Sequence, residues 1–176
     1  EYMIHNARLK VTIISFNELL QAHANSDKPN MQSVDEILFM MQERGLKPNN
    51  ITYGTLIKAS AASGSEYAAE GWLEKMRNEG TVDGQAYSGG IIGFCKLKTE
   101  NGFDSARRWF DESARNGFRP DWHTHLAMIE ISGAGSNPVK NVDLWLWRTI
   151  KISNGKVPGA DRINGCLEIL AKRGLV

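Results

Sequence analysis

One phrase recurs along this chain at intervals of about 35 to 38 residues. Each copy ends a helical stretch at glycine, continues through a short polar junction and opens the next helical stretch with an aromatic side chain or its equivalent. The clearest copies are 45–53 and 117–125, and both carry proline at the junction. A fixed period of this length is typical of a solenoid, whose units bury their apolar faces only by stacking. The period therefore favours a function carried by an extended surface rather than by an enclosed pocket.

Two sets of repeated positions advance together along the chain. The expected helix-closing glycines are Gly45, Gly80, Gly117 and Gly155. The expected helix-opening positions are Phe16, Tyr53, Tyr87, His125 and Ile163. Glycine adopts the left-handed conformation that ends a helix, and a following proline prevents its continuation. These positions predict repeats over 13–49, 50–83, 84–121 and 122–159, with a partial repeat over 160–176.

Apolar residues within each unit recur at helical spacing. Tyr53, Leu56 and Ile57 share one face of an expected helix, and no segment shows the two-residue alternation of a strand. The pattern predicts four helical hairpins and the start of a fifth. Four tryptophans are assigned to second helices: Trp72 and Trp109 are expected in the core, whereas Trp145 and Trp147 are expected on different helix faces.

Composition excludes several classes of function. Lys and Arg number 21 against 20 Asp and Glu, so the net charge of +1 provides no bulk basic field for indiscriminate nucleic-acid or membrane binding. No apolar run reaches the length of a membrane span.

Cys95 and Cys166 lie in helical apolar patterns, which predicts buried thiols and a reducing compartment. Because the chain begins at Glu1 rather than Met, we expect a processed or truncated product.

Neither a catalytic site nor a metal site is expected. Asp111 and Glu112 lie beside arginines on a polar helix face, where charge pairing accounts for them. The histidines of 123–125 lack neighbouring ligands for a metal. The glycine-rich segment 88–93 resembles a phosphate loop, but no strand precedes it and the repeat register predicts a helix there. We therefore expect a binding protein that is not an enzyme and uses no cofactor.

The repeated residues resemble the pentatricopeptide repeat (PPR) family. The resemblance is carried by the first helices at 51–57 and 87–96, and by the second helices with their Gly-x-x-Pro junctions at 34–49 and 103–121. It covers nearly the whole chain and is strongest from about residue 14 to 125. It implies an all-α fold, a right-handed superhelical α-solenoid of stacked helix-turn-helix repeats forming one array over 1–176.

One feature separates this chain from a rival repeat family, and another departs from the PPR pattern. The tetratricopeptide repeat, a peptide-binding rival of similar length, places Trp early in the first helix, whereas Trp72 and Trp109 are expected in second helices here. The inter-helix segments 97–102 and 132–138 are longer than the tight turn of PPR proteins. They are expected to be loops, which act either as simple turns or as docking elements.

PPR proteins are organellar RNA-binding proteins in which each repeat addresses one base. The resemblance implies that the fifth and last residues of a repeat read the base edge, while the second residue packs against the base face. In the first repeat these positions are Asn17 and Asn49, with Ile14 as the packing residue. This pair resembles those that prefer pyrimidines.

The remaining repeats depart from the family pattern to different degrees. The second pairs Gly54 with Asp83 and offers Ile51 for packing, but glycine has no side chain to read a base. The third pairs Ser88 with Asp121, resembling a guanine-preferring combination, and replaces the aliphatic packing residue by glutamine at position 85.

The fourth repeat is expected not to read a base at all. Its pair is Leu126 with Gly159, neither of which hydrogen-bonds through a side chain, and its packing position holds His123. Two pairs in four repeats are therefore legible.

Two functions from different classes remain open. The first is binding of single-stranded RNA through the concave face of the array, in RNA processing, stability or translation, in the chloroplast stroma or the mitochondrial matrix. The second is an architectural subunit that binds other proteins, or structured RNA without sequence preference, in a large organellar complex such as a ribosome or photosynthetic assembly. The legible pairs favour the first, whereas the near-neutral charge and the incomplete pairs favour the second.

Overall fold

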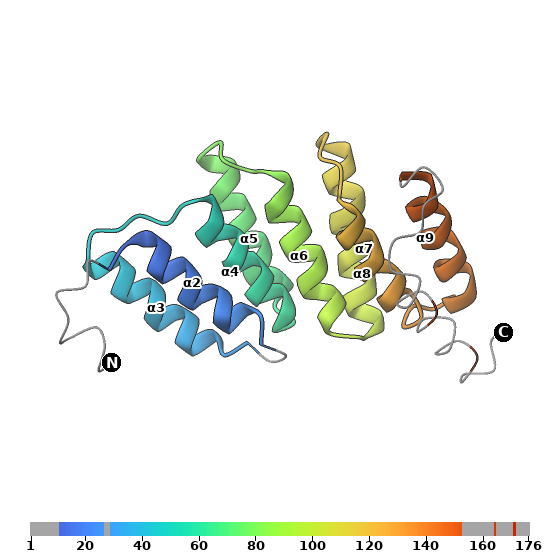
Figure 1. Ribbon diagram of the computed structural model, residues 1–176, viewed down its shortest axis with the longest axis horizontal. Helices are drawn as coiled ribbons and strands as arrows, with labels where there is room; N and C mark the ends of the chain where they lie inside the picture. Colours follow the sequence, from blue (N-terminus) through green and yellow to red (C-terminus); the bar gives the residue numbers. More distant parts are fainter. Residues whose placement is uncertain (1–10, 27–28, 153–163, 165–170, 172–176) are drawn as a thin grey trace.

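The computed structural model describes residues 11–26, 29–152, 164 and 171 (Figure 1). Within them the chain forms eight helices and no strand, which confirms the expected all-α fold. The helices are α2 (Ile13–Ala24), α3 (Met31–Glu43), α4 (Asn50–Ala62), α5 (Glu66–Asn78), α6 (Gly84–Lys96), α7 (Glu100–Arg115), α8 (Trp122–Ser132) and α9 (Pro138–Ile152). Gly155, Gly159, Ile163, Cys166 and nearly all of 160–176 lie outside the described residues, and the division into repeats stays a prediction.

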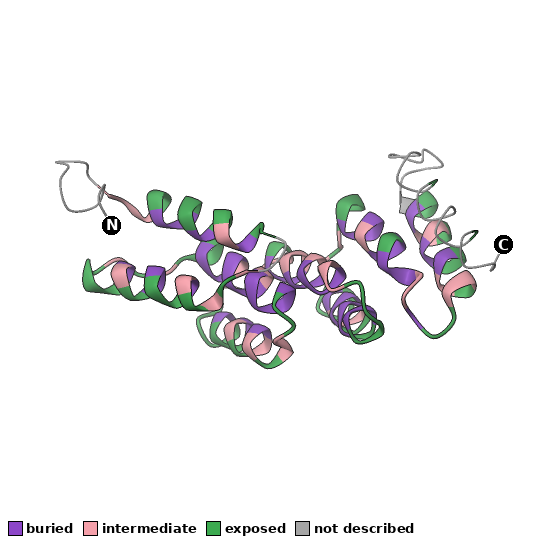
Figure 2. Cartoon of the chain, turned by 90° about the horizontal axis from the view of Figure 1, so that it is seen from below, coloured by how far each residue is buried: buried purple, intermediate pink, exposed green. Residues whose placement is uncertain are grey.

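The helices form an elongated stack, with α2 near one end and α9 near the other (Figure 1). Consecutive helices pair as the hairpins α2/α3, α4/α5, α6/α7 and α8/α9. The first helices of these hairpins, α2, α4, α6 and α8, also pack on one another in succession and form what we term the first-helix row. Buried residues lie on the helix sides that face neighbouring helices (Figure 2). A single apolar cluster therefore runs from Phe16 to Trp145.

Glycines end three of the helices as expected. Their φ angles are positive, at 68° for Gly45, 65° for Gly80 and 81° for Gly117. After Gly45 the N–H of Leu46 donates to the carbonyl of Met41 at 3.1 Å, and equivalent bonds follow α5 and α7. This bond satisfies a carbonyl that the end of a helix would otherwise leave unpaired, so glycine directs the chain into the next repeat.

Aromatic contacts join the two helices of three hairpins. The helix-opening residues Phe16, Tyr53, Tyr87 and His125 are all buried. Three of them contact a second-helix tryptophan, with ring centroids 6.2 Å apart for Tyr53–Trp72, 6.0 Å for Tyr87–Trp109 and 6.3 Å for His125–Trp145. Burial lowers the pKa of His125, so its ring is neutral at pH 7 and packs as an aromatic.

Three of the four tryptophans in second helices occupy the expected environments, and Trp72, expected in the core, lies at its edge. Trp109 is buried in the core, and Trp72 is partly buried against it. Trp145 is 1% exposed and Trp147 is 61% exposed, which confirms that they lie on different faces of α9. Cys95 is buried, as expected, and burial raises the pKa of its thiol.

The glycine-rich segment lies inside α6 and allows close packing. A Cβ atom at Gly90 would lie 2.4 Å from the Trp109 ring. At Gly93 it would lie 2.6 Å from the carbonyl oxygen of Lys58 in α4. Real side chains do not make such short contacts, so glycine is required for α6 to approach both α4 and α7.

The expected loop over 97–102 is wrong in its second half. Helix α7 begins at Glu100, and the hydroxyl of Thr99 accepts a hydrogen bond from the N–H of Gly102 at 3.2 Å. Gly102 is helical, and a Cβ there would lie 2.7 Å from the carbonyl oxygen of Phe94. Gly102 is therefore needed for the close approach of two helices. From the sequence alone, a glycine with this role looks the same as a glycine in a turn. The second expected loop, 132–138, lies between α8 and α9 and is one residue shorter at each end, because Ser132 ends α8 and Pro138 begins α9.

Among the described residues, no group of three or more His, Cys, Asp and Glu side chains is arranged to hold a metal ion. No helix in that part of the chain has the length and apolar character needed to cross a membrane.

Substituting two helical glycines tests the packing of α6. We expect Gly90→Ala to lower the free energy of unfolding by about 1 to 3 kcal/mol, because the new methyl group overlaps Trp109. Gly71→Ala, in α5 where the added Cβ has open space, should raise it by about 0.5 to 1 kcal/mol. Urea denaturation of both variants measures the difference. Equal stability of the two would contradict the close contact.

Candidate nucleic-acid interface

The expected base-reading residues lie along the first-helix row. The fifth residue of a repeat falls in the first or second turn of a first helix, as Asn17 does in α2. The last residue of a repeat immediately precedes the next first helix, as Asn49 precedes α4. Both kinds of position are therefore near the N-terminal ends of these helices.

The first expected pair is joined by hydrogen bonds. Asn17 Nδ2 donates to Asn49 Oδ1 at 3.2 Å, and Thr52 Oγ1 donates to Asn17 Oδ1 at 2.7 Å. Asn17 is 6% exposed, so little of its side chain is accessible to a ligand. Asn49 is exposed and is the more accessible member of the pair.

The second expected pair has a hollow at its glycine. Ile51 and Gly54 line a depression of about 270 Å³ together with Asn25, Lys58 and other residues of α2, α4 and α6. A Cβ atom on Gly54 would have no neighbour within 4 Å. Asp83 precedes α6, where its carboxylate accepts the N–H of Ala86 at 2.9 Å. The reading position at Gly54 is thus open space rather than occupied by another group.

The third expected pair faces a single hollow. Ser88 and Asp121 line a depression of about 460 Å³ with Gly84, Gln85 and Arg119. The structure therefore brings together residues that are far apart in sequence, as the resemblance implies. Arg119 adds a cation that the sequence reasoning did not single out.

The carboxylate of Asp121 is held ionised. Burial opposes its ionisation, but hydrogen bonds from the N–H and hydroxyl of Thr124, at 2.9 and 2.8 Å, outweigh that effect. His123 Nδ1 lies 3.7 Å from the other carboxylate oxygen and acts in the same direction. The pKa of Asp121 is consequently below its ordinary value, and at neutral pH the group accepts hydrogen bonds without donating any.

The expected packing residues of the first two repeats are accessible, whereas the expected reading residue of the fourth repeat is not. Ile14 is 65% exposed and Ile51 is 52% exposed, so both present apolar surface to solvent. In the fourth repeat Leu126 is 1% exposed and belongs to the core. That repeat therefore offers no side chain at its fifth position.

Two lysines near the C-terminal ends of the first helices, Lys58 in α4 and Lys96 in α6, were not singled out from the sequence. Lys96 Nζ donates to the carbonyl oxygens of Ala24, Asn25 and Ser26 at 3.4, 3.1 and 3.3 Å. Lys58 Nζ donates to Asn25 Oδ1 at 2.7 Å. Lys96 thus joins α6 to the C-terminal end of α2, across the intervening repeat. We call these contacts the lysine bridge.

Burial and the charges around the lysine bridge indicate that it stabilises the packing of the helices. Burial lowers the pKa of Lys58, and the nearby charge of Lys96 lowers it further. The carbonyl oxygens at the end of α2 carry the negative end of the helix dipole, which stabilises the ammonium group of Lys96. No spacing in the sequence signals this contact, because the partners are about 70 residues apart.

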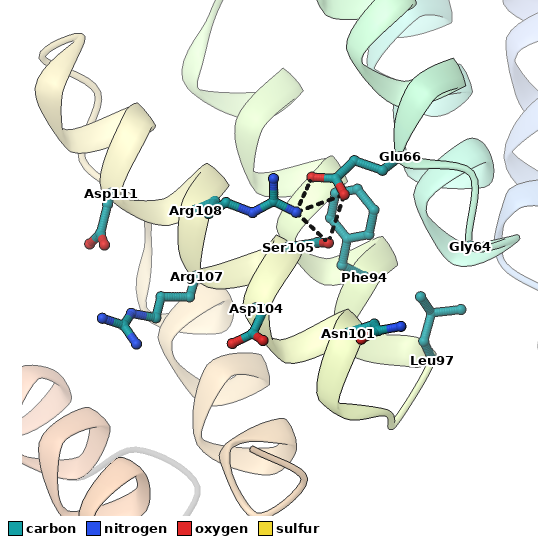
Figure 3. Close-up of a pocket in the computed structure, with 10 residues that line it drawn as sticks. All are labelled: Gly64, Glu66, Phe94, Leu97, Asn101, Asp104, Ser105, Arg107, Arg108 and Asp111. Carbon is teal, nitrogen blue, oxygen red and sulfur yellow. Dashed lines mark hydrogen bonds and ion pairs between the residues drawn. The ribbon is translucent and has the colours of Figure 1, made fainter. Parts of the chain in front are cut away.

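A larger hollow, of about 720 Å³, lies among α5, α6 and α7 and contains none of the expected reading residues (Figure 3). Arg108 and Ser105 of α7 point towards Glu66 of α5, with Arg108 Nη2 2.7 Å and Ser105 Oγ 3.0 Å from its carboxylate. Asp104, Arg107 and Asp111 add charges of both signs to its lining. Arg108 is already paired with Glu66, and this hollow holds none of the residues that the family pattern uses, so the first-helix row remains the better candidate interface.

Comparison with known sequences identifies the family. The sequence model for the pentatricopeptide repeat domain matches residues 4–61 and 36–82. The chain belongs to the pentatricopeptide repeat family. Pentatricopeptide repeat-containing protein At3g09650, chloroplastic, of Arabidopsis thaliana is 28% identical over 153 residues, which cover 85% of this chain and 18% of that protein. At5g25630 of the same species is 29% identical over 126 residues, covering 69% of this chain and 21% of that protein.

Solved PPR structures share the fold. The maize PPR protein PPR10 superposes with a TM-score of 0.64 at 21% identity, covering 98% of this chain and 24% of PPR10. PPR10 in complex with an 18-nt psaJ RNA element superposes with a TM-score of 0.77 at 20% identity, covering 96% of this chain and 25% of PPR10. The helical repeat solenoid expected from the sequence is thereby confirmed. The chain spans about a fifth of the two Arabidopsis relatives and a quarter of PPR10.

Removing the ammonium group of Lys96 tests the lysine bridge. Lys96→Met keeps the apolar stem but loses the three bonds to α2, so we expect the free energy of unfolding to fall by about 1 to 2 kcal/mol. Lys47→Met, at an exposed junction position, is the matched control and should change stability by less than about 0.5 kcal/mol. Urea denaturation measures both, and equal effects would show that the bridge contributes nothing specific.

Proposed function

We propose that this chain binds single-stranded RNA along the first-helix row, as one segment of a longer organellar PPR protein acting in RNA processing, stability or translation. The observation that carries the proposal is the shared hollow of Ser88 and Asp121, two residues that the family pattern pairs. Two named relatives agree with it, since one is described as chloroplastic and PPR10 was solved with RNA. The compartment is the chloroplast stroma or the mitochondrial matrix, and the segment acts by binding rather than by catalysis.

The chemistry of the third pair suits guanine. The Watson–Crick edge of guanine presents N–H donors, and the ionised carboxylate of Asp121 accepts them. Ser88 adds a hydroxyl that both donates and accepts, and Arg119 lines the same hollow, where its charge favours a phosphate. This repeat therefore has a side chain for the base and a cation for the backbone.

The first pair suits a base with acceptors. Asn49 Oδ1 is occupied by the N–H of Thr52 at 3.0 Å, which leaves its amide nitrogen to donate outward. Pyrimidines carry carbonyl acceptors on their base-pairing edge, in agreement with the preference that the family pattern implies. The exposed side chains of Ile14 and Ile51 provide apolar surface for the base faces.

A second function is favoured by a different surface. Leu144, Trp147 and Ile150 of α9 are 43%, 61% and 40% exposed. Apolar side chains at this spacing share one helix face, which is suited to a protein partner. The corresponding alternative is an architectural subunit of a large organellar complex, bound to other proteins through α9.

Selection from a randomised single-stranded RNA pool at two salt concentrations tests the proposal. We expect the chain to enrich a short motif containing guanine, with weaker binding at higher salt. Asp121→Asn should lower the preference for guanine at its position about tenfold, because an amide replaces the carboxylate acceptor. Asparagine retains the ability to cap α8, so the fold should be preserved.

Two results separate the alternatives. Asp143→Asn makes the same change of side chain on the exposed surface of α9 and should leave the motif unchanged. If the unmodified chain enriches no motif at either salt concentration, RNA reading is wrong. Stable association with other protein subunits that Trp147→Ser abolishes would then support the architectural function.

Filling the hollow at Gly54 should create a further reading position. Gly54→Asn places an amide where a Cβ has open space, at the position that the family pattern pairs with Asp83. We expect one additional base to be specified and affinity for the extended motif to rise about fivefold, the equivalent of one net hydrogen bond. Gly71→Asn adds the same side chain in open space on α5 and should leave binding unchanged. An unaltered motif in both variants would show that Gly54 does not lie at a base.

A further inference from the structure

The last residue of a repeat has a structural task besides the expected reading of a base. Asn49, Asp83 and Asp121 each cap the following helix, accepting the backbone N–H three residues later at 3.0, 2.9 and 2.9 Å. The cap commits one side-chain oxygen of each residue to the protein. The second polar atom of each amide or carboxylate is the one left for a ligand, and its direction depends on how the side chain is held.

A threonine hydroxyl supplements the cap at two of these three sites. Thr124 Oγ1 donates to Asp121 Oδ1 at 2.8 Å. Thr52 Oγ1 lies 2.7 Å from Asn17 Oδ1 and 3.0 Å from Asn49 Oδ1. At the remaining site the equivalent residue is Ala86, which has no hydroxyl. Thr52 and Thr124 are both 0% exposed, so neither can touch a ligand directly.

The hydroxyl of Thr52 determines how the Asn17 amide is turned. A hydroxyl has one proton, and the shorter contact directs it to Asn17 Oδ1, while the N–H of Asn49 donates to the hydroxyl at 3.1 Å. Asn17 Nδ2 then donates to Asn49 Oδ1. Rotating the Asn17 amide by a half-turn would place its oxygen against Asn49 Oδ1, and two acceptors repel. One orientation is therefore selected, in which the Asn17 amide nitrogen is held on Asn49 Oδ1 and the amide nitrogen of Asn49 is left to donate outside the network.

At the third pair the hydroxyl distinguishes the two carboxylate oxygens of Asp121. Oδ1 receives both bonds from Thr124, whereas among the described residues the neighbour of Oδ2 is the exposed ring of His123 at 3.7 Å. The carboxylate thus turns a defined oxygen towards solvent. In both cases a buried threonine hydroxyl fixes the orientation of another residue's side chain, the amide of Asn17 or the carboxylate of Asp121.

We propose that Thr52 and Thr124 are positioning residues that set base preference, each by orienting the reading side chains of the preceding repeat. This inference rests on the proposed RNA-binding function. It assigns part of the specificity of one repeat to a buried residue of the next. It also predicts weaker discrimination wherever that residue lacks a hydroxyl, as at Ala86.

Valine and serine variants test the inference. Thr→Val removes the hydroxyl at constant shape, and Thr→Ser retains it. In selection from the randomised RNA pool, we expect Thr52→Val to reduce discrimination about fivefold at the position read by the first repeat and to leave the guanine position unchanged. Thr124→Val should show the reverse pattern, and Thr52→Ser and Thr124→Ser should retain the original preferences.

The design separates positioning from support of the fold. Ala86 shows that a first helix is capped without the hydroxyl, so the valine variants are expected to fold, and thermal unfolding measures this. A purely structural role would weaken binding to all sequences equally, and that result would overturn the inference. A motif that Thr52→Val and Thr124→Val leave unchanged would overturn it while the proposed function stands. Failure of the unmodified chain to enrich any motif would remove the proposed function and the inference together.

Discussion

The hydrogen bond that caps each first helix is the interaction on which both the fold and the candidate interface depend. Asn49, Asp83 and Asp121 satisfy N–H groups that a helix start would otherwise leave unpaired, and each such cap contributes about 1 kcal/mol. The same side chains are the ones expected to contact bases. Since the cap holds each group at the end of a packed helix, any reading surface is preorganised by the scaffold rather than assembled on binding.

The spacing of these capped ends depends on how closely the first helices pack. Gly90 and Gly93 allow α6 to approach Trp109 and the backbone of α4, and the lysine bridge joins α6 to the end of α2. The first helices α2, α4 and α6 are thereby held together along α6 and near their C-terminal ends. Only part of this arrangement presents side chains suited to bases, because Gly54 leaves a hollow and Leu126 is in the core.

Much of the fold could be predicted because it follows from local chemistry. Gly45, Gly80 and Gly117 end helices in the left-handed conformation, and the helix-opening side chains are buried where helical periodicity places them. The loop expected over 97–102 was wrong because Gly102 serves a close approach of helices, a role that resembles a turn in sequence. The candidate site was predicted only as a set of positions. Thr52, Arg119 and the lysine bridge were missed, since their importance comes from contacts between repeats.

The sequence by itself determined the repeat period, the helical hairpins and the family, because these depend on residue spacing within one repeat length. Tertiary structure decided which expected positions are available to a ligand. Stacking buries Asn17 in a hydrogen-bonded network, exposes Asn49 and brings Ser88 beside the same hollow as Asp121. It also turns Thr52 and Thr124 inward against the reading side chains. These outcomes depend on the distance and rotation between neighbouring repeats, which no single repeat encodes.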